Sequence, residues 1–318
     1  MIPARHRSLR PAFAHKGRQA APKGPGVWNR SSEADVDVPV GTRTLQRRPA
    51  RAPEQAASHS RRRRQLEVIL GAAVPAALLI LWQLAASAGW IDPRLYPSPW
   101  TLFMSAKEML SSPDSTLLSD TLATLRRVIF GVVAGGFLGV VVGVGLGSVR
   151  LLRAALEPTL SALYVVPKLA LLPLFMTILG LGERPLLAIV SWTVFFYVWI
   201  YTMEAVIAIP EGYLEAARSL NASWLRTLLH VTIPSALPQL FVALRVGVNV
   251  SVIMIVAAEF LVGTTGLGYL IFDSRRIFSN DAMFVGIAIV SLMGVTLAGI
   301  VAWTGRRITP WARSSRLD

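Results

Sequence analysis

Apolar residues from about position 65 onward are gathered into long runs, and short polar segments separate one run from the next. Most runs are about 20 residues long, which is the length an α-helix needs to cross the roughly 30 Å hydrocarbon core of a bilayer. Backbone polar groups in that core must be paired within the protein, which favours a compact bundle. We predict an all-α integral membrane protein with six transmembrane helices, at about Val68–Ala88, Val128–Ser148, Leu160–Leu181, Leu186–Ile209, Leu237–Val262 and Met283–Thr304.

Two of these runs admit a second interpretation. Ala86-Ser87-Ala88 at the end of the first run resembles a signal-peptide cleavage site, but the polar region before it is too long and further spans follow. In the third run, Lys168 separates two apolar stretches, and Pro173 follows. Proline removes a backbone hydrogen bond and distorts the preceding turn, so we predict one long kinked helix. Two half-helices are the alternative.

Glycines recur at every fourth position of the second predicted span. This spacing places them on one face of a helix, where a neighbouring backbone can approach closely. General tolerance of glycine in membrane helices is the alternative, but the strict register favours close packing. The predicted packing residues are Gly131, Gly135, Gly139, Gly143 and Gly147.

Composition supports a membrane protein and confines the net charge to one segment. Of the 318 residues, 53% are hydrophobic and 16% charged, against about 25% charged in an average soluble domain. Residues 1–64 hold 15 of the 32 Lys and Arg but 4 of the 18 Asp and Glu, so most of the +14 charge lies there. We predict a disordered basic tail over 1–64 and a transmembrane domain over 65–318. The tail fits an electrostatic contact or a dispensable extension, and no nucleic-acid partner is predicted.

The placement of Lys and Arg predicts the direction of the spans, because cytoplasmic loops carry the excess. Without the tail, one side of the predicted membrane holds eight Lys and Arg and the other holds seven, so the count does not decide the orientation. When Arg61–Arg64, which directly precede the first span, are included, the count is twelve against seven. We therefore predict that both termini and the loop at 211–234 lie in the cytoplasm.

The sequence lacks the residue patterns that ATP hydrolysis, a metal site or a charge relay would need. ATP hydrolysis requires a Gly-rich phosphate loop with Lys and Ser or Thr, and none of Lys16, Lys23, Lys107 and Lys168 lies in such a pattern. The four histidines are scattered and there is no cysteine. We predict no catalytic residue, cofactor or metal site.

Two charged residues fall inside the fifth predicted span. A charge near the bilayer centre costs on the order of 3 kcal/mol, so Arg245 and Glu259 both suggest function. Glu259 lies near the outer end, and we predict that it holds an outer gate or a dimer seam against Arg275 or Arg276. Hydration from the outer surface is the alternative. The glycines that follow, in a re-entrant gate segment or a flexible turn, are Gly263, Gly266 and Gly268.

The polar loop between the fourth and fifth spans has the pattern of two short helices. Glu211–Leu220 is rich in helix formers, and Asn221 suits the left-handed position that ends a helix. Ser223 can cap a second helix over Trp224–His230, which we expect Pro234 to stop. A surface helix of this kind can lie in a groove of a partner protein, and an ordinary interfacial loop is the alternative.

The same loop resembles the EAA signature of ABC-importer permeases, which runs Glu-Ala-Ala, three residues, Gly, nine residues and Ile-x-Leu-Pro. The spacing here is identical, with Asn, Val and Ile in place of Gly, Ile and Leu. The resemblance implies an ATPase-coupling loop from Glu211 to Pro234. Its implied coupling residues are Glu215, Ala216, Ala217, Arg218, Asn221, Val231, Ile233 and Pro234.

Further segments over about 65–315 resemble the sulfonate, taurine and nitrate branch of these permeases, among them Pro97-Ser98-Pro99, Leu171–Leu174, Leu179–Glu183, Ala258-Glu259 and Thr265–Tyr269. The resemblance implies a type I ABC-importer permease bundle in the plasma membrane of a bacterium. Its implied partners are ABC ATPase subunits, an extracytoplasmic solute-binding protein and a second permease copy, as a homodimer. The rival functions are a secondary carrier driven by an ion gradient and a structural or signalling membrane protein.

Overall fold

A computed structural model describes residues 53–113 and 115–312 of the chain. Of the tail predicted over residues 1–64, the part at 1–52 therefore lies outside the described residues. Contacts divide the chain into two units, Met1–Arg63 and Arg64–Asp318, and the second unit holds the helical bundle.

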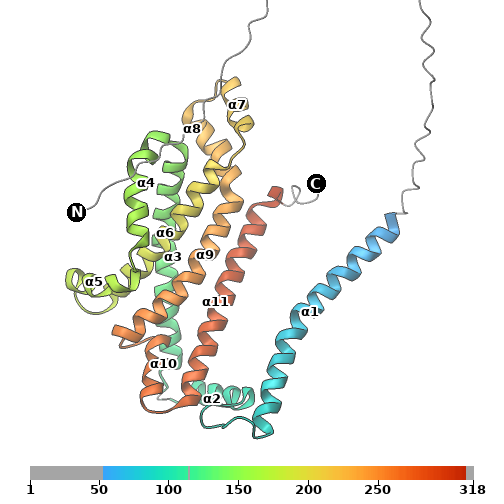
Figure 1. The fold of residues 1–318 in the computed structure, drawn as a ribbon, viewed down its shortest axis with the longest axis vertical. Coiled ribbons are helices and arrows are strands. Elements are labelled where there is room, and N and C mark those ends of the chain that lie inside the picture. The colour runs from blue at the N-terminus through green and yellow to red at the C-terminus, as the bar shows by residue number, and fades with distance from the viewer. Residues whose placement is uncertain (1–52, 114, 313–318) are drawn as a thin grey trace, which may run out of the picture. The chain divides into compact units, whose positions relative to one another are not determined.

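Helices make up the regular structure throughout the described residues (Figure 1). Within residues 53–113 and 115–312, five helices are long and apolar enough to cross a membrane, and a bent helix pair supplies a sixth candidate. The α-helices are α1 (Pro53–Ser87), α2 (Pro99–Ser111), α3 (Leu117–Ser148), α4 (Arg150–Val165), α5 (Leu172–Leu179), α6 (Glu183–Ile207), α7 (Glu211–Ser219), α8 (Trp224–Thr227), α9 (Ile233–Val262), α10 (Leu267–Arg276) and α11 (Asn280–Ile308).

The third predicted span is two half-helices, so the prediction of one long kinked helix is wrong. After α4, the chain passes through Val166 and Pro167 into a 3₁₀ turn at Lys168–Leu171 and then α5. The two halves meet at 90°. Proline lacks the N–H that would continue the backbone ladder and disfavours helical geometry in the residue before it, so Pro167 explains the break.

Helix α3 lies against α6 along the predicted glycine face. A Cβ added to Gly135 would lie 2.2 Å from the backbone oxygen of Ser191, and one added to Gly139 would lie 2.8 Å from that of Phe195. Real side-chain carbons do not come this close to a backbone oxygen, so the approach of α3 to α6 depends on glycine. Gly131, Gly143 and Gly147 meet α6 in the same way.

The apolar core lies between α6 and α9. Val190, Val194 and Val198 of α6 and Ala243 and Ile255 of α9 are fully buried. Outward faces are apolar as well, which is the arrangement expected where lipid or a second protein covers a surface. Examples on α3 and α11 are Phe130, Val133, Phe137, Leu292 and Val295.

Candidate functional site

The predicted coupling loop, residues 211–234, which is called the coupling loop below, begins with the short exposed helix α7. Two backbone hydrogen bonds close its end, from Ala222 N to the Ala217 oxygen (3.0 Å) and from Asn221 N to the Arg218 oxygen (2.9 Å). Asn221 has a φ of 52°, the left-handed conformation that this helix ending requires. The loop therefore has a defined turn at Asn221.

Exposed apolar side chains surround the Glu-Ala-Ala segment. Glu215 and Ala216 are exposed and only Ala217 is buried, which leaves the outer face of α7 uncovered. Large apolar side chains beside it are also more than half exposed: Tyr213, Leu220, Trp224 and Leu225. Apolar surface of this kind at a polar end of the bundle is typical of a site that a partner protein covers.

The second short helix of the loop continues into the membrane span, so the predicted stop at Pro234 is wrong. Ser223 caps α8, accepting from Arg226 N, and a π-helical turn at Leu228–Thr232 joins α8 to α9. Pro234 lies at the start of α9, where the wider turn accommodates its missing N–H. Trp224–Val262 is consequently one helical unit of 39 residues.

The remaining predicted coupling residues lie on or beneath this loop. Arg218 is exposed, and it lines a cavity of 330 Å³ together with Trp224 and with Gly147 and Val206 from the ends of α3 and α6. Val231, Ile233 and Pro234 are half-buried at the junction with α9. The loop thus rests on the ends of the same two helices that pack through glycine.

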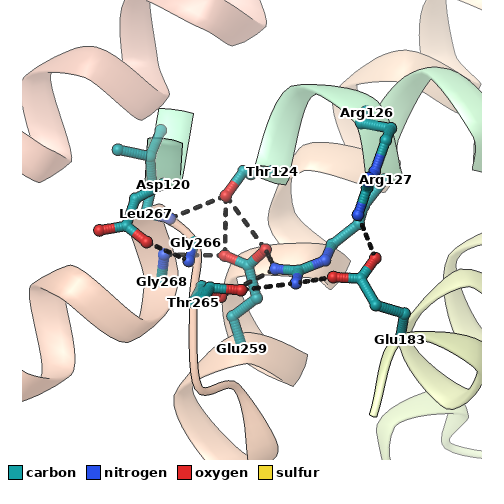
Figure 2. A network of polar contacts seen from close by, with 10 residues as sticks. All are labelled: Asp120, Thr124, Arg126, Arg127, Glu183, Glu259, Thr265, Gly266, Leu267 and Gly268. Atoms are coloured by element: carbon teal, nitrogen blue, oxygen red, sulfur yellow. Dashed lines mark hydrogen bonds and ion pairs between the residues drawn. The ribbon is translucent and has the colours of Figure 1, made fainter. Parts of the chain in front are cut away.

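At the other end of α9, Glu259 is buried in a network of polar contacts (Figure 2). Arg127 Nη1 donates to Glu259 Oε1 at 2.6 Å and to the Thr265 backbone oxygen at 2.8 Å. Its Nη2 donates to Thr265 Oγ1 at 2.9 Å and also contacts Glu183. Arg126 reaches the other oxygen of Glu183 at 2.7 Å. Ion pairs thus join two arginines to two carboxylates.

The same network fixes the backbone that enters α10. Asp120 Oδ1 accepts from Gly266 N at 2.7 Å, Thr124 Oγ1 accepts from Leu267 N at 2.8 Å, and Glu259 Oε2 accepts from Gly268 N at 2.9 Å. Thr124 Oγ1 also donates to Glu259, at 3.0 Å from each carboxylate oxygen. These side chains satisfy the free N–H groups at the start of α10, as a helix N-terminus requires.

The predicted gate glycines lie against Glu259. A Cβ on Gly263 would lie 2.6 Å from the backbone oxygen of Glu259, and one on Gly266 would lie 2.4 Å from its Oε1. One on Gly268 would lie 2.6 Å from the Val256 oxygen. The segment is therefore held closely against α9, which disfavours the interpretation as a loose turn.

The predicted partner of Glu259 is wrong, and so is the alternative that water from the outer surface hydrates it. Its partner is Arg127 of α3, whereas Arg276 lies 3.9 Å from Asp273. Glu259 is also 1% exposed, so it is not hydrated from the surface.

The sequence prediction missed Arg127 because it began the second span at Val128, which placed this arginine outside the helix. The glycine register contained the signal, because Arg127 lies one step of four residues before Gly131, and Thr124 and Asp120 extend the same face.

The network is suited to holding four helices together, α3, α6, α9 and α10, rather than to chemistry. The buried side chains of Glu259, Asp120 and Thr124 all have partners, and of the Arg127 nitrogens only Nε lacks one. Within residues 53–113 and 115–312, no group of three or more His, Asp or Glu could hold a metal ion. We will call Asp120, Thr124, Arg127, Glu183, Glu259 and residues 265–268 the Glu259 network.

Comparison with known proteins identifies relatives that cover most of the chain. Residues 132–310 match the family described as binding-protein-dependent transport system inner membrane component. The taurine transport system permease protein TauC of Escherichia coli is 29% identical, covering 77% of this chain and 90% of its own. The nitrate import permease protein NrtB of Leptolyngbya laminosa is 30% identical, and the match covers 73% of this chain and 85% of NrtB. The bicarbonate transport system permease protein CmpB of Synechococcus elongatus is 31% identical, and the match covers 72% of this chain and 85% of CmpB.

A solved structure shares the fold. A chain of the inward-facing MetNI methionine ABC transporter matches with a TM-score of 0.52 and 23% identity. The match covers 61% of this chain and 94% of that one. The helical arrangement is thus that of an ABC transporter chain.

Proposed function

The chain belongs to the family of binding-protein-dependent transport system inner membrane components, and from that premise we propose that it is the permease subunit of an ATP-driven importer. It forms the path for a small solute such as a sulfonate, taurine or nitrate across a bacterial plasma membrane. A separate ATPase docks on the coupling loop, so this loop and both termini face the cytoplasm. Two copies form the path, and a solute-binding protein delivers from the opposite side.

The observation that carries this proposal is the exposed surface of α7, which directly precedes the continuous helical unit Trp224–Val262. Glu215 and Ala216 face outward beside uncovered apolar side chains, in the register that resembles the EAA signature. A short helix presenting small residues can enter a groove on a partner and couple to it rigidly. An ordinary interfacial loop would also expose Tyr213 and Trp224, so the register of the signature, rather than exposure alone, favours docking.

The helical unit Trp224–Val262 joins the docking surface to the Glu259 network. At 1.5 Å per residue, 39 residues span about 58 Å. Closure of the ATPase dimer would move α7 and α8, and this unit would carry the movement to Glu259 as part of a rigid-body change. The Glu259 network then serves as a clamp at the extracytoplasmic end, keeping α3, α9 and α10 together while the bundle tilts.

A reconstituted importer tests the docking assignment. We expect Glu215→Lys to weaken co-purification of the ATPase and to reduce ATP-dependent uptake into proteoliposomes, because the substitution reverses a charge at the docking surface. Glu108→Lys is the matched control, since Glu108 is also exposed but lies on α2, away from the loop. Thermal unfolding should be similar for both variants, because surface substitutions change stability within about 0.5 kcal/mol.

Two outcomes would overturn the assignment. Normal uptake with normal ATPase co-purification in Glu215→Lys would remove the docking role. Uptake by the chain alone that collapses with an ionophore and ignores ATP would favour the rival secondary carrier.

A further inference from the structure

Lys168 is a cation within a candidate membrane span, and no acidic side chain of the described residues pairs with it. It begins the 3₁₀ turn between α4 and α5, and its side chain is half-buried. Over residues 53–113 and 115–312, the ion pairs involve Arg126, Arg127 and Arg276 but not Lys168. Its Nζ donates instead to the backbone oxygen of Tyr164 at 2.8 Å.

Aromatic rings form the surroundings of this ammonium group. Nζ lies 4.4 Å from the ring centroid of Tyr164, 5.7 Å from that of Tyr197 and 5.8 Å from that of Phe196. The Tyr164 and Tyr197 rings meet edge to face at 5.8 Å. Ring faces attract a cation, but they do not neutralise its charge. The site therefore keeps a net positive charge.

A charge without an acidic partner is costly inside a membrane. The contrast with Arg127 is direct, since that cation contacts two carboxylates. Intramembrane ionisable residues commonly mark the path of a substrate or ion. Interrupted backbone at membrane depth is tolerated where it is covered by protein or lines a water-filled cavity. Figure 1 shows α5 leaving the bundle between the level of α7 and α8 and the level of α10.

We propose that Lys168, with Tyr164 and Tyr197, forms a contact site for a small oxyanion on the translocation path. The ammonium group supplies the charge and the two rings form the walls. This inference rests on the proposed import function and specifies the class of solute carried. The names of the three relatives specify taurine, nitrate and bicarbonate, each of which bears negatively charged oxygens.

Two substitutions at Lys168 separate the effect of its charge from the effect of its hydrogen bond to the Tyr164 backbone oxygen. Glutamine can keep that hydrogen bond but carries no charge, whereas arginine can keep the hydrogen bond and the charge. Uptake of labelled taurine, nitrate and bicarbonate is measured in proteoliposomes holding the permease, its ATPase and its binding protein, together with ATP hydrolysis. Lys107→Gln is the matched control, because Lys107 is an exposed lysine on α2, outside the candidate spans.

We expect Lys168→Gln to lower solute carried per ATP hydrolysed by at least about tenfold, as loss of a charged hydrogen-bonding partner predicts. Lys168→Arg should retain most of the uptake and Lys107→Gln all of it. ATPase assembly should be unchanged in all three, and thermal unfolding should shift only slightly, in Lys168→Gln, which loses the attraction of the ring faces. A purely structural lysine would give the opposite result, with stability falling and the transport ratio kept.

The outcomes distinguish this inference from the function on which it rests. If the unaltered complex carries one of the three anions and Lys168→Gln carries it equally well, the contact site is wrong and the import function stands. If the unaltered complex carries only neutral or cationic solutes, the oxyanion assignment is wrong. If it shows no ATP-dependent uptake of any solute, the proposed function fails and this inference with it.

Discussion

The coupling loop and the Glu259 network lie at the two ends of one helical unit, and they are built in opposite ways. In the loop, Glu215 and Trp224 are exposed, and the turn at Asn221 holds the backbone in place. In the network, Glu259 and Arg127 are almost fully buried and bind each other. If the loop is the docking surface that we propose, it gains free energy from a partner, whereas the network gains it from its own contacts. Damage to the loop should therefore reduce transport, and damage to the network should reduce stability.

The largest effect is expected at Glu259. Glu259→Ala removes a buried carboxylate from Arg127 and leaves Gly268 N without its acceptor. Breaking a buried ion pair from one side costs about 3–5 kcal/mol, because the other charge stays buried and uncompensated. An unfolding titration in mixed micelles should show a loss of this size in the free energy of unfolding.

Glu183→Ala is the internal comparison for that loss. Glu183 contacts the same guanidinium, but its side chain is 41% exposed, so water can replace it. The loss should be nearer to about 1 kcal/mol, as for pairs open to solvent. Equal losses in the free energy of unfolding for Glu259→Ala and Glu183→Ala would show that burial does not determine how much each carboxylate stabilises the protein.

Glycine substitutions sharpen the contrast, because replacing glycine by alanine should lower the free energy of unfolding in the network and raise it in the loop. Gly266 in the network has a φ of +111°, and an added Cβ would lie 2.4 Å from Glu259 Oε1. Gly266→Ala should cost about 1–3 kcal/mol, the usual cost of a strained backbone. Gly212 in α7 has nothing within 4 Å of an added Cβ. Gly212→Ala should stabilise by up to about 1 kcal/mol, through helix propensity.

The same titration measures both glycine variants. A loss in Gly212→Ala would mean that α7 is packed more closely than its exposure indicates. No loss in Gly266→Ala would mean that the segment before α10 can move away from Glu259.

Most of the fold could be predicted from the sequence because membrane helices are signalled by local composition. Apolar runs located the spans, and the glycine register located the face of α3 on which a neighbouring helix packs, but not that this neighbour is α6. The break at Pro167 was assigned incorrectly because a proline signals a distortion but not its angle. The continuation through Pro234 was missed because the π-helical turn before it has no sequence signal that composition reveals.

The two regions differed in how far the sequence could predict them. The loop is contiguous, so its turn at Asn221 and its cap at Ser223 follow from neighbouring residues. The Glu259 network joins residues more than 130 positions apart, and only the packing of α3 against α9 and α10 brings them together. Charge alone predicts a partner for Glu259, but the arginines selected from the sequence, Arg275 and Arg276, are not that partner. Long-range pairing of this kind depends on how the helices pack, which a single sequence does not specify.

The smallest expected effect concerns Asn221, and it tests whether the docking surface depends on the turn that presents it. Asn221→Gly should change the free energy of unfolding by less than about 0.5 kcal/mol, because glycine and asparagine both adopt the left-handed conformation. Asn221→Val should lose about 1–2 kcal/mol, since a branched side chain opposes it. If the turn sets the angle of α7, uptake should fall in the valine variant and persist in the glycine variant. Full uptake by Asn221→Val would show that the ATPase orders α7 on docking, so the loop would be shaped by its partner whereas the Glu259 network is shaped by its own contacts.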